Sequence, residues 1–250
     1  MFPEPRRRSG CTARACKKNC ASWAFEGRDA RRRKRANRER CLVTRAGNCA
    51  GFVLAGGASS RFGQDKALVT FRRETLIARL CALVSGETRS VAVIGAPEKY
   101  AAAGVPCIAD RWPGEGPLGG IVTALESAAQ FAERPSWNLI VGCDMPFLTG
   151  EWLAYLVERT AASASDVVVA RSGLGLEPLC GCWRTDSVAT LRRTFEQGTR
   201  KITDAMKHLR MEILDEMHWK RFDSAGRLFW NMNTRADYEE ARKFLEAEQS

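Results

Sequence analysis

Apolar residues follow two alternating patterns between residues 51 and 245. Short continuous apolar runs predict buried strands, and apolar residues spaced three or four apart predict helices that pack on them. The expected strands are 51–55, 90–95, 105–110, 138–143, 166–170 and 179–183, and the expected helices are 74–84, 118–131, 149–159, 186–195, 203–209 and 234–245. This alternation predicts an α/β domain of three layers, in which helices cover both faces of a mostly parallel, Rossmann-like sheet.

Charge divides the chain into two parts. Residues 1–50 contain 15 Lys and Arg against 4 Asp and Glu, whereas the remainder is balanced, with 24 against 25. Because residues 1–47 have almost no apolar periodicity, they cannot bury enough surface to offset their ordering entropy, and we expect a disordered basic extension. Residues 48–250 are expected to form one domain, and the charge of the extension carries no information on what that domain binds.

The stretch 51–68, GFVLAGGASSRFGQDKAL, combines an apolar strand with a glycine-rich loop and two cations, Arg61 and Lys66. Gly56 and Gly57 lack a Cβ, so the backbone can turn sharply and bring N–H groups close to a ligand. Such groups bind phosphate oxygens, and the cations can neutralise charge on a leaving pyrophosphate. We therefore interpret the loop as a polyphosphate site, with an ordinary strand-to-helix turn as the alternative.

Two commoner phosphate-binding motifs do not fit this loop. A Walker loop needs GxxxxGK followed by Ser or Thr, but the residue five after Gly57 is Phe62, and Gly63 is followed by Gln64. A Rossmann dinucleotide motif needs GxGxxG, but Gly56 and Gly57 are adjacent. The loop therefore indicates a different class of nucleotide-binding protein.

Two carboxylates, Asp110 and Asp144, lie at the carboxyl ends of expected strands. The carboxyl ends of parallel strands meet at the sheet edge where α/β proteins bind ligands. A carboxylate there suits Mg²⁺, which binds carboxylates together with phosphate oxygens and water. From the residues alone, Asp144 could equally be a helix N-cap, and Asp110 could be a turn-forming residue.

The segment LAGGASSRFGQDKAL resembles the loop of nucleotidyltransferases that make molybdenum cofactor dinucleotides, and it is most similar to that of the molybdenum cofactor guanylyltransferases. Sugar-phosphate nucleotidyltransferases have a related loop, usually with Ala before one Gly and with Pro before the Lys. By this resemblance, Gly57 and Asp65 favour the molybdopterin branch over the sugar-phosphate enzymes. Within that branch, LAGG resembles the guanylyltransferases, whereas the cytidylyl relatives usually read LAAG. The resemblance extends to about Asp237 and implies the nucleotidyltransferase variant of the Rossmann-like fold.

The resemblance also implies roles for individual residues. Family members place a Mg²⁺-binding Asp in the segment that here reads CDMP, which corresponds to Asp144, and a nucleotide-contacting Asp before GPLGG, which corresponds to Asp110. The implied catalytic residues are Arg61, Lys66 and Asp144, and the implied nucleotide-binding residues are Leu54, Ala55, Gly56, Gly57, Lys66, Asp110 and Asp144.

Three further segments bear on the site. By resemblance to an NxNT element, Asn233 could join Asp144 at the metal, although Asn-x-Asn-Thr before a helix is often only capping. Glu177 begins an EPL segment that resembles one lying towards the pterin, and a plain strand start is the alternative. Some members have an Asn after the second strand that contacts the nucleotide, but VAVIGAPEK at 91–99 has none.

The resemblance implies transfer of GMP from GTP to molybdenum-molybdopterin, with Mg²⁺ as cofactor. A second glycine at Gly57 leaves room for a purine, which favours guanine. The alternatives are a cytidylyltransferase acting on the same pterin, a sugar-phosphate nucleotidyltransferase, or, in another class, a nucleic-acid-binding protein acting through the basic extension. Molybdenum insertion proteins or apo-molybdoenzyme chaperones are further implied partners. We expect neither nucleic acid nor a membrane to be a partner.

Cysteine and histidine content limits the other chemistries. The ten cysteines include no CxxC pair and several lie in apolar runs, so we expect a reducing compartment and a cytoplasmic protein. Neither histidine lies in a catalytic context. Cys11, Cys16 and Cys20 have the wrong spacing for a zinc module. Because family members begin just before the first strand, we interpret residues 1–47 as the product of a misassigned translation start.

Overall fold

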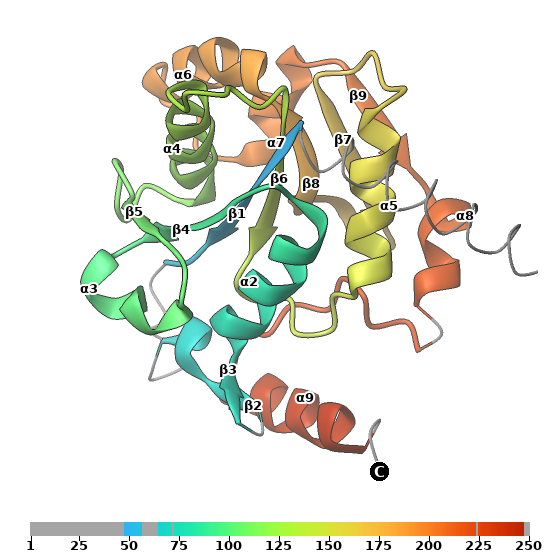
Figure 1. The fold of residues 1–250 in the computed structure, drawn as a ribbon. Coiled ribbons are helices and arrows are strands. Elements are labelled where there is room, and N and C mark those ends of the chain that lie inside the picture. The colour runs from blue at the N-terminus through green and yellow to red at the C-terminus, as the bar shows by residue number, and fades with distance from the viewer. Residues whose placement is uncertain (1–47, 57–64, 72, 224, 248–250) are drawn as a thin grey trace, which may run out of the picture. The chain divides into compact units, whose positions relative to one another are not determined.

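The computed structural model describes residues 48–56, 65–71, 73–223 and 225–247. The chain divides into two units, Met1–Thr44 and Arg45–Ser250, and all described residues belong to the second. At its centre is a seven-stranded sheet with the order β5-β4-β1-β6-β8-β7-β9 (Figure 1). These strands are β1 (Cys49–Leu54), β4 (Val91–Gly95), β5 (Cys107–Ala109), β6 (Trp137–Gly142), β7 (Val167–Ser172), β8 (Gly175–Arg184) and β9 (Met211–Leu214).

The sheet is mostly parallel, as the sequence predicts. Strand β8 pairs antiparallel with β6 and with β7, while the pairs β5–β4, β4–β1, β1–β6 and β7–β9 are parallel. The carboxyl ends of β1, β4, β5 and β6 therefore meet at one edge of the sheet. The loop after β1 and the two predicted carboxylates all follow strands of this group.

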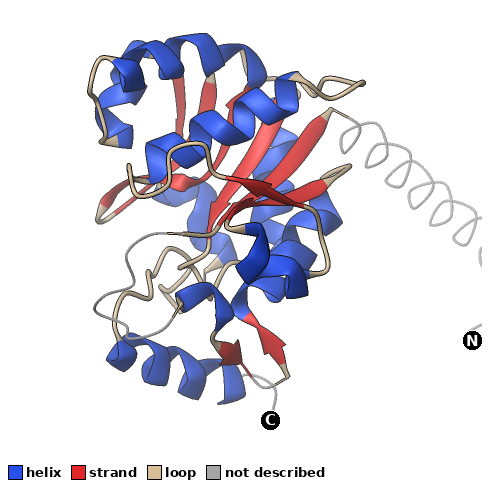
Figure 2. Cartoon of the chain, turned by 90° about the vertical axis from the view of Figure 1, so that its left-hand side faces the viewer, coloured by secondary structure: helices blue, strands red, loops and turns tan. Residues whose placement is uncertain are grey.

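Helices cover both faces of the sheet, which gives the predicted three layers (Figures 1 and 2). Helices α2 and α5 pack on one face, and α4, α6 and α7 pack on the other. In the described part of the chain, no helix is both long enough and apolar enough to cross a membrane. The helices are α2 (Leu76–Glu87), α3 (Pro97–Tyr100), α4 (Pro117–Ala129), α5 (Gly150–Thr160), α6 (Val188–Glu196), α7 (Ile202–Ala205), α8 (Glu216–Trp219) and α9 (Arg235–Ala247).

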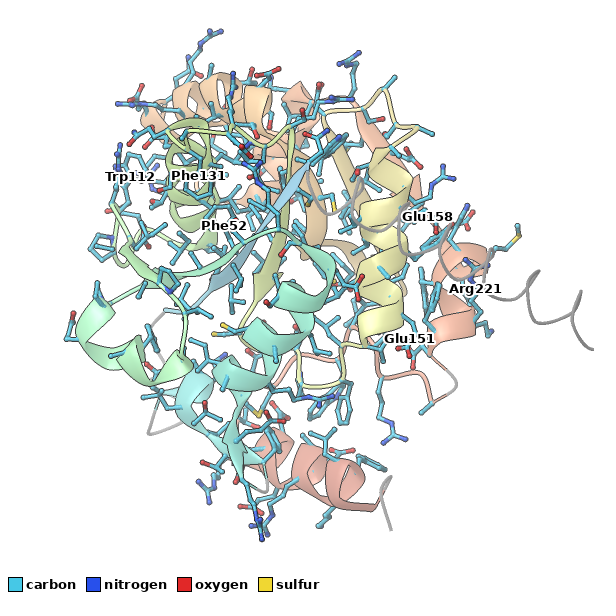
Figure 3. The ribbon with its side chains drawn as sticks, in the orientation of Figure 1. Phe52, Trp112, Phe131, Glu151, Glu158 and Arg221 are labelled. Atoms are coloured by element: carbon cyan, nitrogen blue, oxygen red, sulfur yellow. The ribbon has the colours of Figure 1, made fainter. Side chains whose placement is uncertain are left out.

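Strand β1 is buried along its whole length, because its side chains alternate between the two helical layers. Phe52 and Leu54 belong to the core on the α4 side, and Val53 belongs to the core on the α2 side. The ring of Phe52 lies 6.3 Å from the ring of Phe131 just beyond α4 (Figure 3). Full burial of each such side chain contributes about 1.5–3 kcal/mol. This packing fixes where β1 ends and where its loop begins.

Helix α2 begins two residues later than the expected 74–84. Glu74–Thr75 (β3) pairs antiparallel with Thr70–Phe71 (β2) in a small hairpin, so these residues are extended. The hydroxyl of Thr75 then caps α2 by accepting a hydrogen bond from the amide of Ala78, at 3.3 Å. The spacing of apolar residues predicts the helix, but it cannot show that Glu74 and Thr75 belong to a hairpin instead.

Strand β8 is longer than the expected 179–183, because Pro178 does not end it. The ladder between β7 and β8 pairs Val169 with Gly181 and Arg171 with Leu176, so the register shifts between these two pairs. Pro178 lies inside that shift, where no ladder donor is needed, and proline is tolerated at such irregularities. Strand β8 consequently begins at Gly175, before Glu177, and this amino-terminal end lies beside the carboxyl end of β6.

Candidate active site

The backbone at the end of β1 is held by its neighbours. The amide of Ala55 donates to the carbonyl of Ile94 on β4, at 2.8 Å. Gly56 has φ 152°, a conformation that favours glycine, and the amide of Cys143 donates to the carbonyl of Leu54, at 3.1 Å. Burial raises the pKa of the Cys143 thiol to about 12, so the thiol stays protonated. Of the other loop residues assigned from sequence, Gly57 and Arg61 lie outside the described residues.

Lys66 reaches from this loop to the segment before α9. Its Nζ donates to the Oδ1 atom of Asn233, at 2.9 Å, although the two residues are 167 positions apart in sequence. Lys66 also begins a short 3-10 turn, Lys66–Leu68, whose N-cap is Asp65. One carboxylate oxygen of Asp65 accepts a hydrogen bond from the amide of Ala67, at 3.0 Å. The position of the Lys66 ammonium group therefore depends on the cap of this turn.

Asp144 lies in the turn just after β6 and carries a buried, unpaired oxygen. Among the described groups, none donates a hydrogen bond to its Oδ1 atom. The glycine at 142 makes room for this oxygen, since a Cβ there would lie 2.9 Å from it. Burial raises the pKa of the Asp144 carboxyl, and the nearby Lys66 ammonium group partly opposes that rise. The carboxylate is thus placed where a cation would stabilise it.

The segment Asn231–Thr234 packs against the end of β6. The amide of Met232 donates to the carbonyl of Asp144, at 2.8 Å. The Oδ1 atom of Asn231 is also buried and has no donor within the described structure. Asp237 caps this segment by accepting hydrogen bonds from the amides of Asn233 and Thr234, both at 2.7 Å.

These groups fit a hard divalent cation. Asp144 and Asn231 offer two unpaired oxygens from adjacent backbone segments. Within the described residues there is no group of three or more His, Cys, Asp or Glu that could hold a metal by itself. Mg²⁺ does not need such a group, because it usually binds one or two carboxylates and completes its shell with phosphate oxygens and water. In this structure Asn233, the other candidate ligand, binds Lys66 instead.

Asp110 lies at the end of β5, at the same edge of the sheet. Its Oδ1 atom accepts hydrogen bonds from the amide of Trp112 and the hydroxyl of Thr123, each at 3.1 Å. Its own amide donates to the carbonyl of Gly95 on β4, at 3.3 Å. These contacts shape the turn that leads into α4. These hydrogen bonds agree with the alternative interpretation of Asp110 as a turn-forming residue. A contact between Asp110 and the nucleotide stays a prediction.

Glu177 lies in β8 and is only 6% exposed. Ser172 donates a hydrogen bond to its carboxylate from the neighbouring strand. Burial raises the pKa of the Glu177 carboxyl, and the charge of Asp144 raises it further. Glu177 therefore lies close enough to Asp144 for their charges to interact. Its position inside β8 agrees with the alternative interpretation of the EPL segment as part of an ordinary strand.

Comparison with known proteins assigns the chain to a family. A family profile described as "MobA-like NTP transferase domain" matches residues 51–211. The chain belongs to the MobA-like NTP transferase family.

The relatives agree with the resemblance noted in the sequence. The chain is 32% identical to a probable molybdenum cofactor guanylyltransferase of Pelotomaculum thermopropionicum, over 78% of this chain and 93% of the relative. It is also 32% identical to a protein of the same description from Carboxydothermus hydrogenoformans, over 77% and 94%. The crystal structure of molybdopterin-guanine dinucleotide biosynthesis protein A from Archaeoglobus fulgidus matches with a TM-score of 0.67 and 25% identity, over 79% of this chain and 98% of that one.

Two cysteines and a histidine of this MobA-like NTP transferase have structural roles. Cys180 and Cys182 are fully buried in β8 and pack in the core, as predicted. His218 pairs with Asp215 on the surface, at 2.7 Å. Nucleotidyltransferases of this kind generally use a divalent metal ion, which agrees with the unpaired oxygen of Asp144.

Sequence reasoning missed two residues that hold the loop of this transferase. The amide of Cys143 donates to the carbonyl of Leu54 at the end of β1, at 3.1 Å, and the hydroxyl of Tyr100 donates to the carboxylate of Asp65, at 2.7 Å. Neither contact has a local pattern that could predict it, because each joins segments that are far apart in sequence.

Proposed function

We propose that this chain transfers GMP from GTP to molybdenum-molybdopterin, forming the guanine dinucleotide cofactor and pyrophosphate. The relatives named above are described as molybdenum cofactor guanylyltransferases, and the similarity covers more than nine-tenths of their length. The observation that supports the proposal is that Lys66 lies close enough to Asp144, at the carboxyl edge of the sheet, for their charges to interact. GTP and molybdenum-molybdopterin are then the two substrates.

The transfer needs positioning and charge stabilisation more than a strong base. An oxygen of the pterin's terminal phosphate is already anionic, and it attacks the α-phosphorus of GTP while the bond to the β-phosphate oxygen breaks. Negative charge then gathers on the departing pyrophosphate, and a preorganised cation such as Lys66 lowers the barrier by stabilising it. Asn233 holds the Lys66 ammonium group in place. Mg²⁺ held by Asp144 and Asn231 would neutralise phosphate charge.

The proposed function also implies a cellular location and protein partners. We place the enzyme in the cytoplasm, where it would receive or deliver pterin through molybdenum insertion proteins or apo-molybdoenzyme chaperones. The described cysteines support this setting, because those at 49, 81, 107, 143, 180 and 182 are all free thiols. Reduced thiols are usual in the cytosol.

The nucleotide base provides the direct test of the function. The test measures activity with purified molybdenum-molybdopterin and each nucleoside triphosphate in turn. The kcat/KM for GTP should exceed that for CTP by more than about tenfold. A site whose groups hydrogen-bond guanine leaves those groups unpaired when another base binds. The measurement is pyrophosphate release together with detection of the dinucleotide product.

Reactions without pterin provide the control for this panel, since pyrophosphate release should depend on the acceptor. Equal use of GTP and CTP would contradict guanine specificity. Release supported by a sugar phosphate, and not by the pterin, would contradict the choice of acceptor.

We also propose that residues 48–250 form the complete catalytic domain. In support, the described sheet, helices and candidate site all lie within the unit Arg45–Ser250. A chain that begins at Val43 should keep the kcat, the KM for GTP and the Tm of the full chain. Steady-state kinetics and thermal unfolding of both proteins check this, and a lower Tm or kcat in the shorter chain would assign residues 1–42 a structural or catalytic role.

A further inference from the structure

Tyr100 connects the strand next to β1 with the turn that carries Lys66. Its side chain is only 2% exposed, and its hydroxyl donates to the Oδ2 atom of Asp65, at 2.7 Å. The other oxygen of the same carboxylate, Oδ1, accepts the amide of Ala67 and so caps the turn that Lys66 begins. Asp65 thus uses one oxygen for the tyrosine and the other for the turn.

The ring of Tyr100 is itself held in place. A Cβ at Gly95 would lie 2.7 Å from the Cε2 atom of this ring and 2.3 Å from the carbonyl oxygen of Ala55. The absent side chain at Gly95 therefore lets the ring and the end of β1 both pack against the end of β4. Tyr100 thus packs against the sheet edge and, through its hydrogen bond to Asp65, links the position of that edge to the position of the turn.

The tyrosine remains a hydrogen-bond donor at all ordinary pH values. Burial raises the pKa of the Tyr100 hydroxyl, and the hydrogen bond to Asp65 raises it further. A hydrogen bond from a neutral hydroxyl to a carboxylate is among the stronger kinds in proteins. The contact can therefore fix one orientation of the Asp65 carboxylate.

From this arrangement we infer that Tyr100 is a positioning residue for the transfer reaction: through Asp65, it sets the Lys66 turn so that the ammonium group meets the phosphates of the nucleotide. The inference rests on the proposed function of Lys66. It adds a residue that touches neither substrate but aligns the cation that does. A misplaced catalytic group is costly even when its chemistry is intact.

The test removes the hydroxyl alone. Tyr100→Phe should lower kcat about tenfold, the effect expected for partial loss of one aligned electrostatic contact, while KM for GTP changes by less than about twofold. In a Lys66→Ala background, the same substitution should cause no further loss of kcat, because the group it positions is gone. A loss of equal size in both backgrounds would overturn the inference, and so would an unchanged kcat in the single variant.

A matched control separates positioning from general stability. Thr88→Val removes another buried hydroxyl hydrogen bond, the one donated to the carbonyl of Val84 at 2.8 Å, near the amino-terminal half of β1. Its kcat should equal that of the unmodified enzyme even if its Tm falls. If Tyr100→Phe does not fold, Asp65→Asn replaces it and should show the same dependence on Lys66.

A second measurement requires no turnover. Hydrogen exchange of the Ala67 amide should become faster in Tyr100→Phe, because the carboxylate that caps the turn loses its anchor. If the unmodified chain transfers no nucleotide but the exchange rate rises as expected, the proposed function fails while the link from Tyr100 to the Lys66 turn holds. An unchanged exchange rate would show that Asp65 caps the turn without help from Tyr100, which would overturn the inference.

Discussion

Replacing Asp144 by asparagine should lower kcat by about 10²–10³-fold, the scale for losing one preorganised electrostatic contact at a reacting centre. The substitution keeps the shape of the side chain but removes the charge that would hold the cation, so the Mg²⁺ concentration that gives half-maximal activity should rise. Metal-free Tm should stay the same or increase, because burial already disfavours the charged carboxylate and Oδ1 has no donor in the described structure. Kinetics across a Mg²⁺ titration and thermal unfolding without metal measure these effects.

Asp204→Asn is the matched control for this variant. Asp204 pairs with Lys207 at 2.7 Å on α7 and η4 (Met206–His208), and its substitution removes an equal charge from the surface. Its kcat and Mg²⁺ response should match those of the unmodified enzyme. An Asp144→Asn enzyme with an unaltered Mg²⁺ response would show that the metal is held elsewhere.

Lys66→Ala should lower kcat by about 10²-fold or more while KM for GTP rises much less, because the ammonium group acts on charge that grows during the transfer. The fold should tolerate the change, since the hydrogen bond to Asn233 is solvent-exposed and contributes about 1 kcal/mol at most. The Asp144 carboxyl loses a stabilising neighbour, so its pKa should rise further. Steady-state kinetics with saturating pterin, together with Tm, test the variant.

Lys207→Ala removes a surface lysine that pairs with Asp204 and should leave kcat unchanged. Lys66→Arg adds a second comparison: a planar guanidinium cannot occupy the place of a compact ammonium group, so it should restore only part of the lost rate. A change confined to KM in Lys66→Ala would mean that the lysine binds the ground state and not the developing charge.

Periodicity of apolar residues predicted most of the domain, because it reports burial directly. The strands β1, β4, β5 and β6 and the helices α2, α4, α5 and α9 lie close to their expected ranges. The reason is visible in β1, whose side chains are buried on both faces and therefore read as one apolar run. Parallel order and the gathering of Asp110 and Asp144 at one edge followed from the alternation of strands and helices.

Short elements and long-range contacts could not be predicted in the same way. Strand β9, Met-Glu-Ile-Leu, is four residues long and mostly half-buried, so it has no clear period. The hairpin of β2 and β3 has only two residues on each side. In the site, the bond from Lys66 to Asn233 and the bond from Tyr100 to Asp65 depend on chain folding across 167 and 35 positions, and no local pattern encodes them.

The distance in sequence between Lys66 and Asn233 has a consequence for the order in which a newly made chain becomes an enzyme. A chain is synthesised from its N-terminus, and a domain generally folds as a unit. Strands β1, β4, β5 and β6 lie within the first 142 residues, but the amide that donates to the carbonyl of Asp144 belongs to Met232. The catalytic edge is therefore completed among the last steps of synthesis. The sheet itself needs residues up to the end of β9, so the sheet and the site both depend on the last part of the chain to be made.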